Sequence, residues 1–160
     1  MGSQLQFERI TERDVPALYE LRRAAIRGGC VGHYTSAQID AWSSPLSDIG
    51  LQKSLPEHSY FAKIDGEIVA CGMLDVTTER IDGVIVSPSH FRRGIGRAMM
   101  QHLERIARDF GVKHLMLDAT LNAVDFYRSL GFQGDAMGSY HSPRGVILEC
   151  VPMSKQLVVP

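Results

Sequence analysis

The sequence has little of what marks membrane, secreted or nucleic-acid-binding proteins. None of its apolar runs approaches the roughly 20 residues that a membrane-spanning helix needs. Its first residues lack the basic start and apolar core of a signal peptide, and its net charge of −1 provides no broad cationic surface for nucleic acid. We therefore expect a cytoplasmic protein whose partners include neither membranes nor nucleic acids.

Cysteine is scarce, and the three that occur, Cys30, Cys71 and Cys150, lie far apart and form no C-x-x-C pair. This spacing argues against a disulfide scaffold and against a cysteine zinc site. The histidines also lack ligand spacing, so we expect no metal. The chain instead has 44% hydrophobic residues, enough for a packed core, and no repeat or long linker. These features predict a single domain over residues 1–160.

Hydrophobic periodicity and turn residues predict the order of the elements. Two capping boxes, starting at Thr11 and Thr35, open helices, and further helices are predicted around 48–55, from Ile95 to Gly111, and over 122–130. The predicted strands are 59–64, 67–76, 80–86, 114–118, one from Phe132 onward, and 145–153. Helices first, then a strand meander, then alternating strands and helices predict a mixed-sheet α/β (α+β) domain with helices on both faces.

The segment that runs from strand 80–86 through a loop into the first turn of the long helix is the most informative part of the sequence. It contains two glycines and three arginines, namely Arg92, Arg93, Gly94, Gly96 and Arg97. The first turn of a helix has unpaired N–H groups and the positive end of the helix dipole, and glycines let a ligand approach the backbone closely. The pattern therefore predicts a diphosphate site.

Two other phosphate-binding loops do not fit this segment. A Walker A loop requires a Gly-Lys pair, and the chain has none. A dinucleotide fingerprint requires a third glycine at the position where this chain has Met99. The remaining alternative to a diphosphate site is an ordinary helix N-terminus with solvated arginines.

A second motif runs from Asn122 to Phe132, and with it the chain resembles the GCN5-related N-acetyltransferase (GNAT) superfamily. That family has a Q/R-x-x-G-x-G/A acyl-CoA loop after its fourth strand and N-x-x-x-F-Y-x-x-x-G-F on the helix after its fifth. The second motif matches at Asn122, Phe126, Tyr127, Gly131 and Phe132. The first motif departs at Phe91, where the family usually has Gln or Arg. Because the implied grip is mostly through backbone N–H groups, we expect it to be retained.

The resemblance implies a three-layer fold with a central, mostly antiparallel sheet that splays between strands 4 and 5. It also implies acetyl-CoA as the cofactor, bound in the gap beside strand 80–86, where a backbone N–H would polarise the thioester carbonyl. The cofactor-binding residues implied in this way are Val84, Ile85, Val86, Arg92, Arg93, Gly94, Ile95, Gly96, Arg97, Asn122 and Phe126.

Tyr127 is the candidate general acid, since acyl transfer from a thioester expels a thiolate that a neighbouring phenol can protonate. The alternative is a core aromatic, because Tyr127 lies in an apolar helical stripe with Phe126 and Leu130. Asn122 has two compatible interpretations as well, a cofactor contact and a helix N-cap.

Asp82 is the candidate general base, which would remove a proton from the protonated amine. Alternatives for this role are water or one of Glu79, Asp118, Tyr140 and His141. The predicted substrate-binding residues, which are aromatic or polar-tipped, are Tyr34, Trp42 and His141. Core packing is the alternative for Trp42, which lies near helical spacing from Ile39.

Together these features predict an acetyl-CoA-dependent N-acetyltransferase that moves an acetyl group directly to a primary amine. Cys71 and Cys150 have no evident histidine partner, so they are expected to be buried strand cysteines rather than nucleophiles. The lack of charged tracts favours a small-molecule amine, and monomer and homodimer both remain open. The competing hypotheses are a non-catalytic acyl-CoA-binding or sensing module and a nucleotide-binding regulator.

Overall fold

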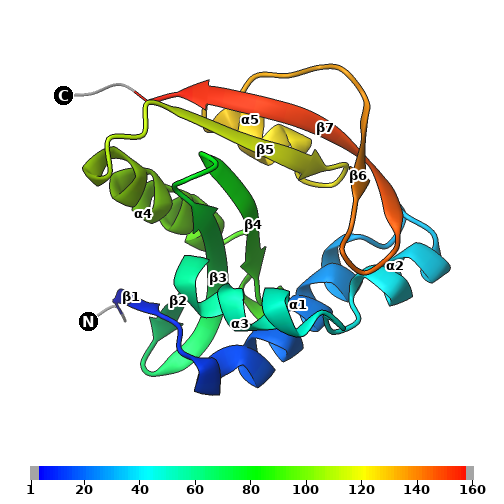
Figure 1. Cartoon of the computed structure of the whole chain (residues 1–160), viewed down its shortest axis with the longest axis horizontal. Helices are drawn as coiled ribbons and strands as arrows, with labels where there is room; N and C mark the ends of the chain where they lie inside the picture. Colours follow the sequence, from blue (N-terminus) through cyan, green and yellow to red (C-terminus); the bar gives the residue numbers. More distant parts are fainter. Residues whose placement is uncertain (1–3, 158–160) are drawn as a thin grey trace.

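The computed structural model describes residues 4–157, which form a seven-stranded mixed sheet with helices on both faces (Figure 1). The strands are β1 (Leu5–Arg9), β2 (Ser59–Ile64), β3 (Glu67–Asp75), β4 (Arg80–Val86), β5 (His114–Thr120), β6 (Gly138–His141) and β7 (Ile147–Gln156). The helices are α1 (Val15–Gly29), α2 (Ser36–Trp42), α3 (Ile49–His58), α4 (Ile95–Asp109) and α5 (Val124–Ser129). None of these helices combines the length and the apolarity needed to cross a membrane.

Local sequence signals account for most of the element boundaries. The Asp14 carboxylate accepts a 2.8 Å hydrogen bond from the Thr11 N–H just before α1, and the Thr35 hydroxyl accepts one from the Gln38 N–H at the start of α2. Asp65 and Gly66 both have positive φ in the two-residue turn between β2 and β3, as a tight hairpin turn requires. The predicted capping boxes and hairpin are therefore confirmed.

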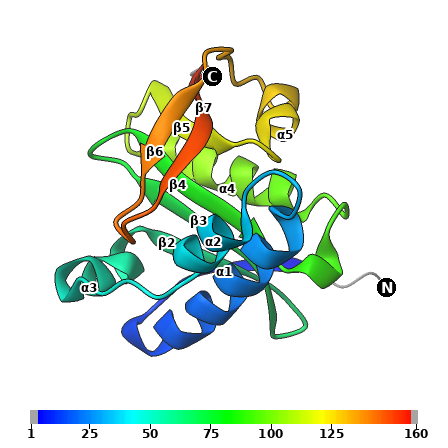
Figure 2. The same cartoon turned by 90° about the vertical axis from the view of Figure 1, so that its right-hand side faces the viewer.

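Helices α4 and α5 pack on one face of the sheet and α1 packs on the other (Figure 2). The larger core cluster includes Met99 and Leu103 of α4, whereas Leu18 and Leu21 of α1 belong to a second cluster. Gly72 of β3 allows α4 to approach closely, because a Cβ atom there would lie only 2.7 Å from the Met99 sulfur. The three-layer arrangement expected from the sequence is thus confirmed.

The sheet order is β1-β2-β3-β4-β5-β7-β6, and only the β4–β5 pair is parallel among the described strands. That pair has a single registered position, Arg80 opposite Met116, where the Met116 N–H donates to the Glu79 carbonyl at 2.9 Å. Beyond it the two strands diverge, as Figure 1 shows. The predicted splay between the fourth and fifth strands is therefore present.

Two features of the fold differ from the sequence predictions. Helices were expected to come first, yet the described chain begins with β1, a short edge strand that pairs with β2. A strand was also expected from Phe132 onward, but only Gln133 forms an isolated bridge there, with Ser154. Gly134 follows, at a place where a Cβ atom would lie only 2.1 Å from the Pro152 carbonyl oxygen of β7, and β6 begins only at Gly138.

Candidate functional site

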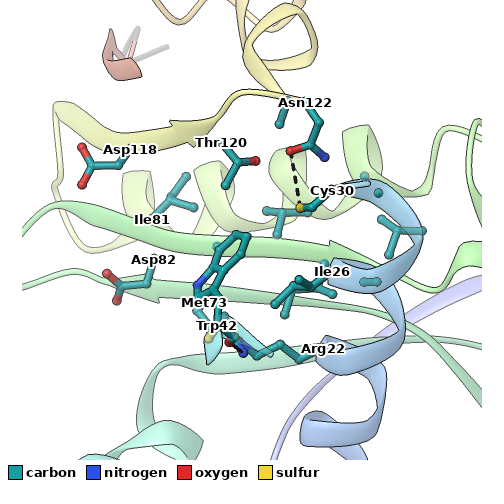
Figure 3. Close-up of a pocket in the computed structure, with 18 of the residues that line it drawn as sticks. Arg22, Ile26, Cys30, Trp42, Met73, Ile81, Asp82, Asp118, Thr120 and Asn122 are labelled. Carbon is teal, nitrogen blue, oxygen red and sulfur yellow. Dashed lines mark hydrogen bonds between the residues drawn. The ribbon is translucent and has the colours of Figure 1, made fainter. Parts of the chain in front are cut away.

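The divergence of β4 and β5 opens a cleft of about 1130 Å³. Its walls come from α1, from the two diverging strands, from the loop before α4, from α5 and from the β6–β7 hairpin. Figure 3 shows Asp82 and Asp118 at one end of this cleft, Trp42 in its centre, and Asn122 beside Cys30 at the other end. The fold thus brings together most of the residues that the two sequence motifs pointed to.

The loop before α4 presents backbone N–H groups at the mouth of the cleft. The first intrahelical bond of α4 runs from the Ala98 N–H to the Gly94 carbonyl at 3.0 Å, so the N–H groups of residues 95–97 have no partner within the helix. Arg92 and Gly94 both have positive φ, 61° and 78°, which bends this loop into the helix. Unpaired donors at the positive end of a 15-residue helix make this turn suited to a phosphate group.

The arginines of this loop differ in their positions. Arg92 and Arg97 line the cleft, and the Arg97 guanidinium lies 3.5 Å from the Ser129 hydroxyl of α5. Arg93 does not line it, although the sequence placed it among the cofactor residues. Gly96 serves packing as well as access, because a Cβ atom there would lie 3.2 Å from the Phe126 ring.

Strand β4 directs alternate peptide groups into the gap. The Ser87 N–H donates to the Val69 carbonyl of β3 at 2.8 Å, so by alternation the peptide groups of Ile85 also face β3. Those of Val84 and Val86 then face the side where β5 has diverged. The side chain of Ile85 packs toward α1, and those of Val84 and Val86 pack toward α4. The gap is therefore lined by unpaired backbone groups that a ligand could bind.

Asn122 lies in the cleft wall but does not cap α5, so the N-cap interpretation is wrong. Helix α5 begins at Val124 with Ala123 at the N-cap position. The Asn122 side-chain oxygen instead accepts a contact of 3.7 Å from the Cys30 thiol (Figure 3). Burial raises the pKa of Cys30 to about 11, which keeps this thiol protonated as a donor at neutral pH.

Tyr127 occupies the boundary between the cleft and the core. Its side chain is 7% exposed and packs edge-on against the rings of Phe126 and Phe132, with centroid distances of 5.1 and 5.8 Å. It also belongs to the residues that line the cleft. Burial raises the pKa of Tyr127 to about 12, so the phenol keeps its proton throughout the neutral range. The packing and the proposed acid role are compatible at this position.

The acidic end of the cleft contains Asp82 on β4 and Asp118 on β5. Asp118 forms a 2.8 Å ion pair with Arg80, across the point where the two strands still pair. Loss of water around the Asp82 carboxyl raises its pKa, an effect that the nearby Arg80 partly offsets. Glu79 does not line the cleft, which makes it a poor candidate for the base.

The predicted acceptor residues Tyr34, Trp42 and His141 all line the cleft. The Tyr34 hydroxyl is already engaged, since it donates to the Glu149 carbonyl at 2.6 Å and accepts from the Leu121 N–H at 3.1 Å. Trp42 packs edge-on against Tyr34, with ring centroids 6.2 Å apart. Tyr34 and Trp42 thus help to build the pocket wall.

The three cysteines are free and buried, as expected for Cys71 and Cys150. Burial raises the pKa of Cys71 to about 12, and it raises the pKa of Cys150 as well. A thiol with a raised pKa is a poor nucleophile at neutral pH, because little thiolate is present. This chemistry supports direct transfer over a covalent route.

Sequence reasoning missed two arginines that line the cleft, Arg22 on α1 and Arg144 in the β6–β7 turn. Arg22 has a recognisable signal, because it lies four residues after Leu18 and four before Ile26, within the buried stripe of α1. A charged residue in an apolar stripe indicates a buried polar contact. Arg144 has no such signal, since only the folded hairpin brings it to the cleft.

Comparison with known proteins agrees with this fold. A GCN5-related N-acetyltransferase from Rhodopseudomonas palustris, also described as a class-II aminotransferase, superposes with a TM-score of 0.88 at 23% identity over 98% of this chain and 99% of that one. The PaiA N-acetyltransferase of Thermoplasma acidophilum, solved in complex with coenzyme A, gives a TM-score of 0.75 at 16% identity over 96% and 99% of the two chains. At these identities the likeness shows the fold alone.

Part of the sequence is also similar to that of a named acetyltransferase. A streptothricin acetyltransferase from Streptomyces lavendulae is 40% identical over 55 residues, which make up 32% of this chain and 29% of that enzyme. The chain therefore matches less than a third of that relative's length. A much longer segment, residues 16–132, matches the model of the acetyltransferase (GNAT) family. This segment includes all of α1 but its first residue, both diverging strands, the loop before α4, and Tyr127. The chain therefore belongs to the GNAT acetyltransferase family.

Proposed function

We propose that this protein transfers an acetyl group from acetyl-CoA to the primary amine of a small molecule, directly and within the cleft between β4 and β5. The observation that carries the proposal is the continuity of the site. The unpaired N–H groups at the start of α4, the open edge of β4 and the phenol of Tyr127 all line one cleft.

The residues fit the donor in their chemistry. The first turn of α4 and the side chains of Arg92 and Arg97 would hold the diphosphate, with Arg93 adding positive charge from outside the cleft. Peptide groups of Val84 and Val86 would bind and orient the arm that carries the acyl group. When bound, acetyl-CoA supplies a thioester carbonyl that is activated toward amines. Other residues with a proposed binding role are Ile85, Gly94, Ile95, Gly96, Asn122 and Phe126.

Tyr127 is proposed to hold the proton that the leaving sulfur needs. Its raised pKa, about 12, keeps the phenol protonated but makes it a weaker acid than an exposed phenol. The role therefore depends on its position at the cleft wall rather than on its acidity. General acids of this kind contribute about 10²–10⁴ in rate.

Asp82 is proposed to accept a proton from the incoming ammonium group. Its raised pKa brings the carboxylate closer to the range in which a base works well near neutrality. Tyr140 and His141 line the same cleft and are the alternative groups for this step. Asp118 is less suited, because its carboxylate is paired with Arg80.

Two broader expectations belong to this proposal. A reaction that depends on acetyl-CoA, in a protein whose three cysteines are free, fits the cytoplasm. The pocket wall formed by Tyr34, Trp42 and His141 suits a small acceptor in either a monomer or a homodimer.

The proposal is tested by measuring thiol release from acetyl-CoA in the presence of a panel of primary amines. We expect release that depends on the amine and saturates with it, together with an acetylated product detected by mass spectrometry. Calorimetric titration with coenzyme A serves as the control for binding. Binding of coenzyme A without turnover of any amine would instead favour the non-catalytic acyl-CoA-binding module.

A further inference from the structure

The part of the cleft around Trp42, where the acceptor is proposed to bind, contains two arginines that the proposed chemistry does not use. Arg22 of α1 is only 8% exposed, and its guanidinium lies 5.5 Å from the centre of the Trp42 ring while donating to the Trp42 carbonyl. Arg144 is half-buried, and its Nε donates to the Ser44 carbonyl at 2.6 Å. Both side chains line the cleft and are held in place by backbone carbonyls.

Neither arginine pairs with a carboxylate of residues 4–157, whose ion pairs involve other cations. Burial, together with the nearby positive charge of Arg144, lowers the pKa of Arg22 to about 9. Two cations that are close enough to repel, one of them buried, are costly unless an anion compensates them. The uncompensated positive charge of these two side chains therefore makes this part of the cleft suited to an anion.

A third polar group points to the same conclusion. The Tyr19 hydroxyl is fully buried, has no hydrogen-bond partner among the described residues, and lies in the same wall of the cleft. Tyr19 and Tyr140 are both close enough to Arg22 and Arg144 to raise the pKa of each guanidinium, against the lowering by burial. A buried hydroxyl without a partner costs free energy, so it is a donor available to a ligand.

We propose that Arg22, Arg144 and Tyr19 bind a carboxylate of the acceptor, so that the substrate is an amine that also carries a carboxylate, as amino acids do. Guanidinium groups match the geometry of a carboxylate, which supports this ligand over a cation. Tyr140 lies within electrostatic range both of the two arginines and of Asp82 and Asp118. The acceptor thus extends from the arginines, where its carboxylate binds, toward the aspartates, where its amine reacts.

This inference rests on the proposed acetyl transfer and does not change the bonds or protons of that reaction. A carbon–nitrogen bond to the acetyl group forms as the carbon–sulfur bond breaks. The ammonium group loses two protons, one of which ends on the thiol and the other in solvent.

Trp42 provides a test that does not depend on turnover, because it is the only tryptophan of the chain and lies against Arg22. We expect its fluorescence to change saturably when α-amino acids such as L-methionine are added, and to change little with the matched amide, L-methioninamide. The same pairs are compared for thiol release in the presence of acetyl-CoA. We expect kcat/KM to favour the carboxylate over the amide by about tenfold or more, the value of one charge-assisted hydrogen bond.

Three variants identify the side chains. Arg22→Gln and Arg144→Gln should each remove most of the preference for carboxylate while coenzyme A affinity stays unchanged, and Arg23→Gln on the exposed side of α1 should retain the preference. Arg144→Gln keeps the test decisive if Arg22→Gln does not fold, because Arg144 is less buried. Equal turnover of the amino acids and their amides would overturn the inference, and so would a preference for the carboxylate that survives in Arg144→Gln. Neither result would contradict the proposed acetyl transfer. A fluorescence change without turnover of any amine would support the anion site and contradict the proposed function.

Discussion

Tyr127 illustrates how one side chain serves both packing and chemistry. Its ring fills the core between Phe126 and Phe132, while the residue also lines the cleft. Removing the hydroxyl leaves the ring and its packing in place, because no described residue forms a hydrogen bond with that oxygen. Substitution by phenylalanine therefore separates the two roles.

We expect Tyr127→Phe to lower kcat by about 100-fold or more, with coenzyme A affinity and melting temperature close to those of the wild type. Stopped assays of thiol release measure kcat, calorimetric titration measures coenzyme A affinity, and a thermal melt gives the melting temperature. Tyr60→Phe, on β2 and outside the cleft, is the matched control. Unchanged turnover in Tyr127→Phe would show that this tyrosine only packs.

The buried phenol also predicts a change in stability at alkaline pH. Its pKa is raised from 10.0 to about 12, so below pH 10 it is protonated in both the folded and the unfolded chain. Between these two values only the unfolded chain releases the proton, and stability therefore falls as the pH rises. The free energies of unfolding of the wild type and of Tyr127→Phe are measured in urea at each pH. We expect the wild-type value minus the variant value to fall by about 2 kcal/mol over this interval. A constant difference would mean that the phenol is hydrated in the folded state.

At this scale the sequence predicted types of residue better than their partners. Asp82 was predicted to lie in the cleft because it precedes the cofactor residues on strand 80–86, and Trp42 because aromatic and polar-tipped residues gather around the glycine-rich kink after the first helix. The bond between Asn122 and Cys30 joins residues that are 92 positions apart, and no local pattern indicates it. Arg22 was detectable in principle, since its charge interrupts an apolar stripe.

Helix α4 is the element whose N-terminal end forms the predicted diphosphate site. Its C-terminal end provides a control, because a glycine of similar conformation lies there. Gly94 and Gly111 flank the helix, both have φ near 78°, and neither would bring a Cβ atom within 4 Å of another group. The same substitution at both ends therefore imposes a similar backbone strain. Only the N-terminal end faces the cleft.

We expect Gly94→Ala and Gly111→Ala each to destabilise the fold by about 1 kcal/mol, because alanine is strained in the left-handed region. Gly94→Ala should also weaken coenzyme A binding by about tenfold, because relief of the backbone strain would move an N–H donor out of place, whereas Gly111→Ala should not. Denaturation and calorimetric titration measure the two effects. Equal coenzyme A affinity in both variants would argue against a diphosphate site at this turn.

Elements with strong local signals were predictable, and those that depend on distant contacts were not. The long amphipathic helix and strand 80–86 were located from periodicity and flanking glycine or proline. Strand β1 is short and owes its conformation to pairing with β2. The paired residues, such as Leu5 and Ile64, lie more than 50 positions apart in the sequence. The chain after Phe132 alternates weakly, and Gly134 lies against β7 where a side chain would not fit, a contact that no local pattern indicates.

For the whole molecule, cofactor binding is expected to increase thermal stability, because only the folded chain forms the cleft. Coenzyme A at 100 times its dissociation constant should contribute about 2.7 kcal/mol and raise Tm by about 5–10 °C. ATP and NAD at the same concentration should raise it less. A larger shift with ATP or NAD would support the nucleotide-binding regulator, and a thermal melt with each ligand decides between them.

The single registered contact between β4 and β5 means that the sheet consists of two half-sheets with a wedge between them. A ligand arm that carries amide groups could occupy this wedge as an additional strand does, and so complete the ladder. Hydrogen exchange of the backbone amides along β4 would then respond to binding at every second residue. Those of Ile85 and Ser87, already bonded to β3, should exchange slowly with or without coenzyme A, whereas those of Val84 and Val86 should become protected only in the complex.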